Sequence, residues 1–151
     1  DVSHLSRRGF RDVAGIARAP FLASHSNCNA VYRHPRSLTD RQIDCIITRG
    51  GLIGINLYRA FLGRPGSAGF AAAHRHIRHV LERGGEHVLA LGSDFDGCEL
   101  EPCFAGVEKL EAFQDYLLAN GMPQEQADAL FYKNAEKFFQ TLLQPQTDML
   151  K

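Results

Sequence analysis

Short apolar segments that end in polar residues alternate with helical segments along this chain, and this alternation restricts the fold more than any other feature. Three apolar runs, at 21–23, 52–57 and 87–92, have the composition of strands that are covered on both faces. A shorter strand end is predicted at 1–4. Strands that alternate with helices predict a parallel sheet with right-handed crossover connections.

The helices are predicted from apolar periodicity and from their start and stop signals. Thr39 and Gln42 have the spacing of a capping box, and Gly50-Gly51 and Gly84-Gly85 follow two of the expected helices. A loop rich in Gly, Pro and Ser is expected around 63–69. The predicted helices are at about 8–18, from 39 to the Gly pair at 50, and at about 70–83, 106–119, 123–131 and 133–143.

The resulting order of about four βα units, followed by extra helices, is compatible with two α/β folds. One is the C-terminal half of a (β/α)8 TIM-type barrel, and the other is a doubly wound open sheet. In both folds the ligand binds at the carboxyl ends of the parallel strands. Functional residues are therefore expected at the ends of the predicted strands.

Length, charge and cysteine content exclude several classes of protein. The 151 residues suit one domain, and 17 basic residues balance 17 acidic ones without a basic stripe, so nucleic acid is not an expected partner. No apolar run approaches the roughly 20 residues that a transmembrane helix needs. The four cysteines form no C-x-x-C pair, which favours reduced thiols and a cytoplasmic location.

Histidines follow two of the predicted strands, at His4 and His25. Neutral imidazole is a common zinc ligand, and two such side chains on neighbouring strand ends could share one ion. The Ser residues beside them, with nearby carboxylates, could hold the second ring nitrogens. The alternative is that both are hydrogen-bonded structural histidines.

Two further strand-end residues are candidates for chemistry. Arg36, in the loop after the second strand, could hold a carboxylate with two hydrogen bonds, or it could be a solvated loop residue. Asp94 follows the fourth strand and could act as a general base and acid, whereas Asp96-Gly97 reads as a turn. The remaining strand ends in Asn56.

Three histidines on one predicted helix, His74, His76 and His79, are interpreted differently. The i, i+3 spacing of the last two permits metal binding in principle. We expect all three to be surface residues of the outer helical layer.

Five segments, taken in order and spacing, resemble the membrane (renal) dipeptidase family of zinc metallopeptidases. The resemblance runs from residue 1 to about 140. The five segments together indicate this family far more specifically than any single segment does. They read Asp-Val-Ser-His-Leu-Ser at 1–6, Ala-Ser-His-Ser-Asn at 23–27, His-Pro-Arg-Ser-Leu-Thr-Asp at 34–40, Gly-Gly-Leu-Ile-Gly-Ile-Asn at 50–56 and Leu-Gly-Ser-Asp-Phe-Asp-Gly at 91–97.

The resemblance implies a (β/α)8 barrel with a binuclear zinc site that hydrolyses dipeptides, including some with a D residue at the C-terminal position. It implies that His4 and His25 bind the second zinc ion. By the same resemblance, Arg36 contacts the substrate and Asp94 transfers a proton to the leaving amine. A lactonase or deaminase barrel would also place histidines at strand ends, but the segments containing His25 and Arg36 favour the dipeptidase.

The chain also departs from the family pattern. The His-x-Asp motif of the first strand and the Glu that bridges the two metals are not found in it, Ser37 replaces the usual Asn, and the Gly-x-Asn-x-x-Arg pattern is altered at 132–137. We therefore interpret 1–151 as a partial metallohydrolase domain without its N-terminal half. We expect the isolated chain to be weakly active or inactive, and to pair with the missing half or with itself. A non-catalytic binding or assembly module is the alternative.

Overall fold

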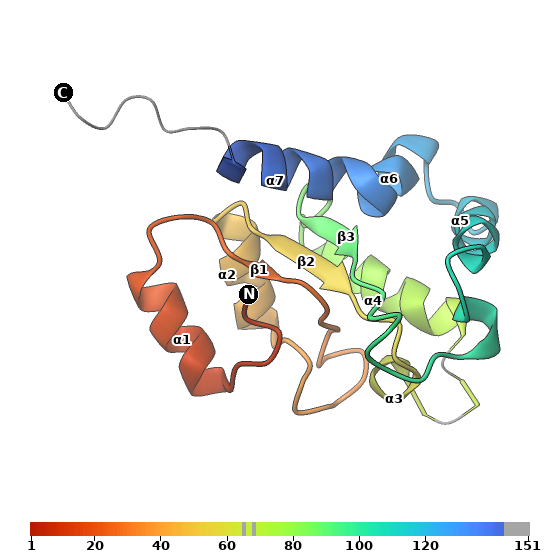
Figure 1. Ribbon diagram of the computed structural model, residues 1–151, viewed down its shortest axis with the longest axis horizontal. Helices are drawn as coiled ribbons and strands as arrows, with labels where there is room; N and C mark the ends of the chain where they lie inside the picture. The colour runs from red at the N-terminus through yellow and green to blue at the C-terminus, as the bar shows by residue number, and fades with distance from the viewer. Residues whose placement is uncertain (65, 68, 144–151) are drawn as a thin grey trace.

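A parallel three-stranded sheet forms the centre of the computed structural model, which describes residues 1–64, 66–67 and 69–143 (Figure 1). The strands are β1 (Leu22–Ala23), β2 (Leu52–Ile55) and β3 (Leu89–Leu91), in the order β1-β2-β3. Leu22 pairs with Leu52, and Ile53 pairs with Leu89. A mixed α/β fold with a parallel sheet is thus confirmed, while the half-barrel remains a prediction.

The described residues form three strands rather than the expected four, because the segment at 1–4 is a turn and not a strand. Its backbone nevertheless lies beside β1, where the Val2 amide donates to the Leu22 carbonyl at 2.8 Å. The Leu5 amide then donates to the Val2 carbonyl at 3.0 Å, which turns the chain away before a second ladder bond forms. The segment therefore occupies the place of the predicted first strand without continuing the sheet.

Helices connect the strands and then extend beyond β3. The expected capping box is present at the start of α2, where Gln42 Oε1 accepts a hydrogen bond from the Thr39 amide at 2.9 Å. The helix predicted at 123–131 is divided, and a π-helical turn at Ala129–Lys133 joins its two neighbours. The short helix α3 was not predicted, and part of the expected loop around it, residues 65 and 68, lies outside the described residues. The helices are α1 (Arg7–Ile16), α2 (Asp40–Thr48), α3 (Arg59–Leu62), α4 (Phe70–Glu82), a 3-10 turn (Pro102–Phe104), α5 (Lys109–Ala119), α6 (Gln124–Asp128) and α7 (Asn134–Leu143).

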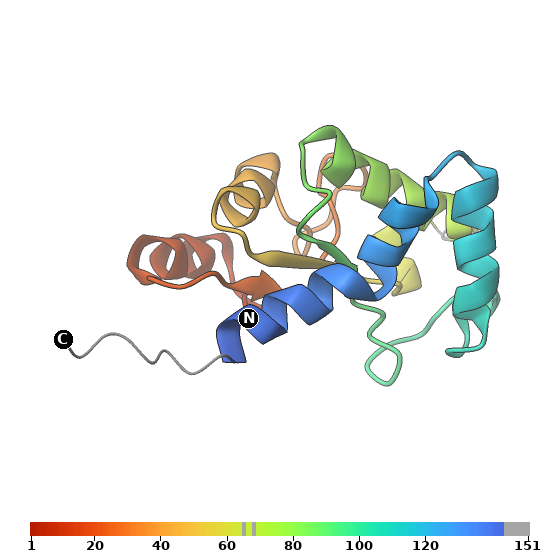
Figure 2. The ribbon, with the colours of Figure 1, turned by 90° about the horizontal axis from the view of Figure 1, so that it is seen from above.

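The two faces of the sheet are covered by different helices, as Figure 2 shows. Helices α2 and α4 lie on one side, and their Ile and Val side chains pack with Ile53, Ile55 and Leu89 in the main core. Helix α7 lies on the other side, where Phe138 packs against Leu52 and Ala90. None of the described helices combines the length and apolar character needed to cross a bilayer.

The first turns of helix α7 lie beside the amino ends of the strands. The Asn134 side-chain amide donates to the carbonyls of Glu86 and Leu89, at 2.7 and 2.8 Å, just before and at the start of β3. Pro20 and Gly51, which precede β1 and β2, line a hollow together with Phe138. Since α7 occupies this end of the sheet, the carboxyl ends of the strands are left for other residues.

Two glycines allow the carboxyl ends of the strands to approach one another. A Cβ added to Gly54 would lie 2.0 Å from the Ser24 carbonyl oxygen and 2.9 Å from the Gly92 Cα. A Cβ on Gly92 would lie 1.9 Å from the same oxygen. Only a residue without a side chain fits at either position, so the end of β1 can come close to the end of β3.

We expect Gly54→Ala to lower the free energy of unfolding by about 3 kcal/mol, because the new methyl group meets backbone atoms that cannot rotate away. Urea unfolding followed by circular dichroism measures the change. Gly15→Ala is the matched control, because nothing lies within 4 Å of its added Cβ and Ala favours the helix. Equal stabilities of the Gly54 variant and the parent would contradict the close approach.

Candidate active site

His4 and His25 lie together at the carboxyl end of the sheet. His25 follows β1 by two residues, and His4 lies in the turn beside that strand. Their Nε2 atoms are 2.8 Å apart, and their ring centroids are 4.8 Å apart. The two predicted metal ligands therefore direct the same ring atom toward one point, although they are 21 residues apart in the sequence.

Arg36, in the loop between β1 and α2, contacts the other ring nitrogen of His4. Its Nη1 lies 2.8 Å from His4 Nδ1, and its guanidinium carbon lies 5.8 Å from the centroid of the Phe61 ring of α3. The Arg36 Nε is buried, and no hydrogen-bond partner for it is found within the described part of the chain. An arginine with an unused buried donor is suited to an additional anionic ligand.

Asp94 follows β3 by three residues, in a backbone conformation that few residues adopt. Its φ is 61°, the left-handed region that Asp and Asn tolerate better than most side chains. The buried Asn56 side chain, at the end of β2, donates from Nδ2 to Asp94 Oδ2 at 3.2 Å. A Cβ on Gly97 would lie 2.2 Å from Asp94 Oδ1, so this glycine leaves room for the carboxylate.

Electrostatic effects connect Asp94 with the histidine pair. Burial lowers the pKa of His25 below its ordinary value, the Asp94 carboxylate opposes this change, and the neighbouring His4 and Arg36 contribute to the lowering. Asp94 is therefore close enough to affect the titration of His25. The structure thus gathers all four sequence-predicted residues, His4, His25, Arg36 and Asp94, around one end of the sheet.

The hydrogen-bond directions show how this site would accept a metal ion. Arg36 can only donate, so the neutral His4 ring accepts at Nδ1 and carries its proton on Nε2. Tetrahedral zinc, with Zn–N distances of about 2.0–2.1 Å, holds two imidazole nitrogens roughly 3.3 Å apart, slightly more than the 2.8 Å observed here. Ligation by both histidines therefore needs a small ring movement and the release of His4 Nδ1 by Arg36.

The donor set fits only part of a catalytic zinc site. Among the residues that the structure describes, no group of three or more His, Cys, Asp or Glu side chains is placed to hold a metal ion. Catalytic zinc sites normally have three protein ligands and an open position for water. His4 and His25 could supply two of these, and the remaining ligands would come from elsewhere.

The prediction for His76 was wrong, because this residue is fully buried rather than at the surface. Its Nδ1 accepts a hydrogen bond from the Cys28 amide, and its Nε2 lies 3.1 Å from the Leu62 carbonyl oxygen. His76 thus fastens α4 to the loop after β1 and to α3. His74 and His79 are partly buried, and His79 contacts Asp40.

One of the four cysteines touches the site, because the Cys98 thiol donates a hydrogen bond to the Asp94 carbonyl at 3.1 Å. All four are free thiols, as the absence of a C-x-x-C pair led us to expect. Burial raises the pKa of Cys28 to about 12 and that of Cys98 to about 11. Neither thiol is therefore a reactive nucleophile near neutral pH.

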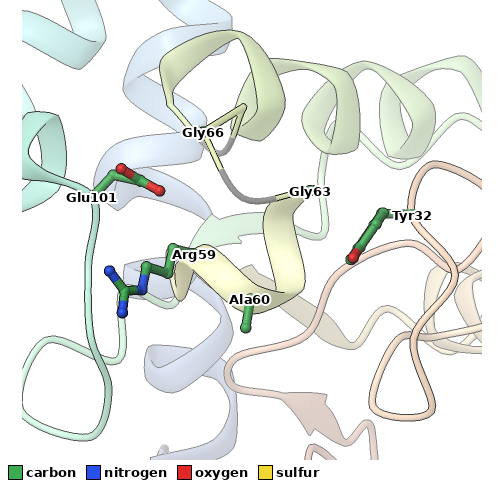
Figure 3. A pocket seen from close by; sticks show the side chains of 6 residues that line it. All are labelled: Tyr32, Arg59, Ala60, Gly63, Gly66 and Glu101. Carbon is green, nitrogen blue, oxygen red and sulfur yellow. The ribbon is translucent and has the colours of Figure 1, made fainter.

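A second hollow, of about 410 Å³, lies along α3 and is shown in Figure 3. Tyr32, from the loop that also carries Arg36, forms one side of it, and Arg59 and Glu101 form the other. The four predicted site residues are not among its lining residues. This hollow is therefore distinct from the point at which the histidines meet.

Comparisons with known proteins identify relatives of this chain in sequence and in fold. The family model described as "Membrane dipeptidase (Peptidase family M19)" matches residues 1–149. An uncharacterised Klebsiella pneumoniae protein encoded in the pqqA 5' region is 38% identical over 138 residues, which cover 89% of this chain and 51% of that protein.

Two solved structures are similar in both fold and sequence. A metallopeptidase from Rhodobacter sphaeroides, liganded with a phosphinate mimic of the dipeptide L-Ala-D-Ala, superposes with a TM-score of 0.88 at 36% identity, over 93% of this chain and 41% of its own. A crystal structure described as dipeptidase AC, a metallopeptidase, gives the same TM-score and identity over 93% of this chain and 43% of its own.

The chain spans about half the length of the Klebsiella relative and less than half of each solved chain. The family match extends over nearly all of its residues, and the expected family is thereby confirmed. This chain belongs to the membrane dipeptidase family of metallopeptidases.

Proposed function

We propose that this chain supplies one side of the active site of a zinc-dependent dipeptidase. The observation that carries the proposal is the convergence of two imidazole Nε2 atoms, a guanidinium and a carboxylate at the carboxyl ends of three parallel strands. These side chains come from four separate segments of the sequence. Membership of the dipeptidase family supports the same assignment.

In the proposed site, His4 and His25 hold one zinc ion through Nε2. A bound zinc ion provides Lewis acidity, which polarises the scissile carbonyl and makes water nucleophilic near neutral pH. Burial of His25 lowers its pKa and so favours the neutral ring, the form that can bind a metal ion.

Arg36 is proposed to bind the carboxylate of the dipeptide. Its Nη1 and Nη2 can together form two parallel hydrogen bonds to a carboxylate, once Nη1 releases His4. Phe61 packs beside the guanidinium, which limits its freedom before the substrate binds. Arg36 would thereby orient the peptide bond relative to the histidines.

Asp94 is proposed to carry the proton from the attacking water to the leaving amine. Asn56 holds one carboxylate oxygen, and the absence of a side chain at Gly97 leaves room for the other. A general base must lie within hydrogen-bonding reach of the proton that it accepts. The proximity of Asp94 to His25 is consistent with that role.

The partner that completes the site is proposed to add strands beside the present sheet. β1 and β3 form the edges of the described sheet, and unpaired edges favour the addition of further strands. Either a complementary part of the barrel or a second copy of the chain could pair with these edge strands. Only the first would also supply the missing metal ligands of the family pattern.

A chimaera tests the proposed function. The chain replaces its matched 36%-identical segment in the Rhodobacter metallopeptidase, and hydrolysis of L-Ala-D-Ala is measured with and without zinc. We expect zinc-dependent turnover by the chimaera and little or none by the 151-residue chain alone, since two histidines make an incomplete site.

The controls separate loss of function from loss of fold. Circular dichroism and light scattering confirm that each protein is folded and report its association state. A folded chimaera without activity would contradict the dipeptidase proposal. Rapid turnover by the isolated monomeric chain would contradict the view that its site is incomplete.

A further inference from the structure

The Asp1 carboxylate receives four hydrogen bonds from the two segments that carry the metal-binding candidates. Asp1 Oδ1 accepts from the amide and the hydroxyl of Ser3, at 3.0 and 2.9 Å, and from the Ser24 amide at 3.1 Å. Asp1 Oδ2 accepts from the Ser24 hydroxyl at 2.5 Å. This carboxylate therefore ties the turn containing His4 to the end of β1.

Both serines also form hydrogen bonds with His25. Ser3 Oγ accepts a hydrogen bond from the His25 amide at 3.0 Å, and Ser24 Oγ lies 2.7 Å from His25 Nδ1. Asp1 thus fixes the backbone of His25 through Ser3 and its ring through Ser24. Among the described residues, Asp1 itself makes no hydrogen bond to the ring.

The number of hydroxyl protons determines the direction of each bond. A serine hydroxyl has one proton, and an ionised carboxylate can only accept, so the Ser24 proton lies toward Asp1. Ser24 Oγ then has only lone pairs to offer to His25, and Nδ1 must carry the ring proton. In a neutral imidazole this leaves the lone pair on Nε2, which is the atom directed toward His4.

We propose that Asp1 is a positioning residue which acts through Ser24 to hold His25 in the tautomer whose Nε2 can bind a metal ion. The inference rests on the proposed function only in assigning a metal to Nε2. The tautomer itself is a property of the metal-free chain. Asp1 and Ser24 are not catalytic residues, since neither contacts the proposed reacting atoms.

The substitution Asp1→Asn reverses the direction of the bonds with almost no change in size. The Asn oxygen can still accept from the Ser3 and Ser24 amides, but its NH2 group now donates to Ser24 Oγ. The Ser24 proton is then free to point at His25 Nδ1, which at 2.7 Å is closer than the alternative acceptor, Ser3 Oγ at 3.3 Å, and Nδ1 becomes the acceptor. The ring proton is expected to move to Nε2.

The tautomer is measured by long-range 1H–15N correlation spectra of the folded, metal-free chain at about pH 8, where an ordinary histidine is neutral. The spectra are recorded in a His4→Ala background. In the parent, a hydrogen bond from His4 Nε2–H to His25 Nε2 would by itself keep the His25 proton on Nδ1. We expect the proton on Nδ1 in the background protein and in Ser24→Thr, on Nε2 after Asp1→Asn, and no fixed position after Ser24→Ala.

Zinc affinity gives a second readout in the chimaera, which retains His4 and supplies the ligands that the isolated chain lacks. We expect Asp1→Asn to weaken binding at least 10-fold, as is typical when the hydrogen-bond partner of a ligating histidine is removed. Asp12→Asn is the charge-matched control, because Asp12 is exposed on α1, and its affinity should stay within about twofold of the parent.

The two readouts distinguish the inference from the proposed function. An unchanged His25 tautomer after Asp1→Asn, in a chain that circular dichroism shows to be folded, would overturn the positioning role. If the parent chimaera binds no zinc but the tautomer of the metal-free chain reverses as expected, the positioning role stands and the assignment of a metal to this site fails.

Discussion

Replacing Asp94 with Asn in the zinc-loaded chimaera should reduce dipeptide hydrolysis by about 10²- to 10⁴-fold, the range typical of a lost general acid–base group. Asn tolerates the left-handed backbone at this position, and its side-chain oxygen can still accept from Asn56. The substitution therefore removes the ionisable group while keeping the local geometry. The fall should appear in kcat more than in KM, because Asp94 is proposed to act on the proton and not to hold the substrate.

Asp96→Asn is the matched control for this prediction. Asp96 is exposed in the same loop, two residues away, and removing its charge changes the local field in a similar way. We expect its activity to stay within about threefold of the parent. Equal losses in the two variants would show that the loop needs negative charge in general, and the proposed proton transfer would be wrong.

The acid sensitivity of the fold should depend strongly on His76. Burial lowers the pKa of His76 to about 4 from an ordinary value of 6.5, although the hydrogen bond to the Leu62 carbonyl opposes this change. The unfolded chain therefore binds more protons than the folded chain between these two values. The free energy of unfolding should fall by about 3 kcal/mol as the pH falls from above 6.5 to below 4.

Urea unfolding at a series of pH values, compared between the parent and His76→Gln, measures this contribution. The variant is expected to be less stable near neutral pH, since the Cys28 amide loses its acceptor, but its stability should fall less steeply with acid. The lowered pKa values of His25, His34 and His74 act in the same direction in both proteins, so the difference isolates His76. His87→Gln is the control, because His87 is exposed, and parallel curves for the parent and His76→Gln would contradict the prediction.

The sequence predicts the features that depend on local pattern. The strands β2 and β3, the capping box of α2 and the helices beside the sheet follow from apolar periodicity and from Gly pairs. The positions of His25 and Asp94 follow as well, because parallel strands place their carboxyl ends at one edge. Local signals such as these need no knowledge of distant contacts.

The features that depend on distant contacts were missed. His76 lies on a helix with charged neighbours, and only the approach of the Cys28 amide and the Leu62 carbonyl explains why it is buried. Phe61 belongs to a helix too short to show periodicity, so its contact with Arg36 was not predicted. The Ser3 and Ser24 hydroxyls beside the histidines were a usable signal, but their common partner, Asp1, was not identified.

The contact between Arg36 and His4 implies that the proposed zinc and substrate sites influence each other. As long as the guanidinium donates to His4 Nδ1, the neutral ring has no lone pair on Nε2 for an ion. A peptide carboxylate that draws the guanidinium away frees that ring, and an ion that takes the ring frees the guanidinium. Such mutual release is positive heterotropic cooperativity, in which each ligand raises the affinity for the other by the same factor.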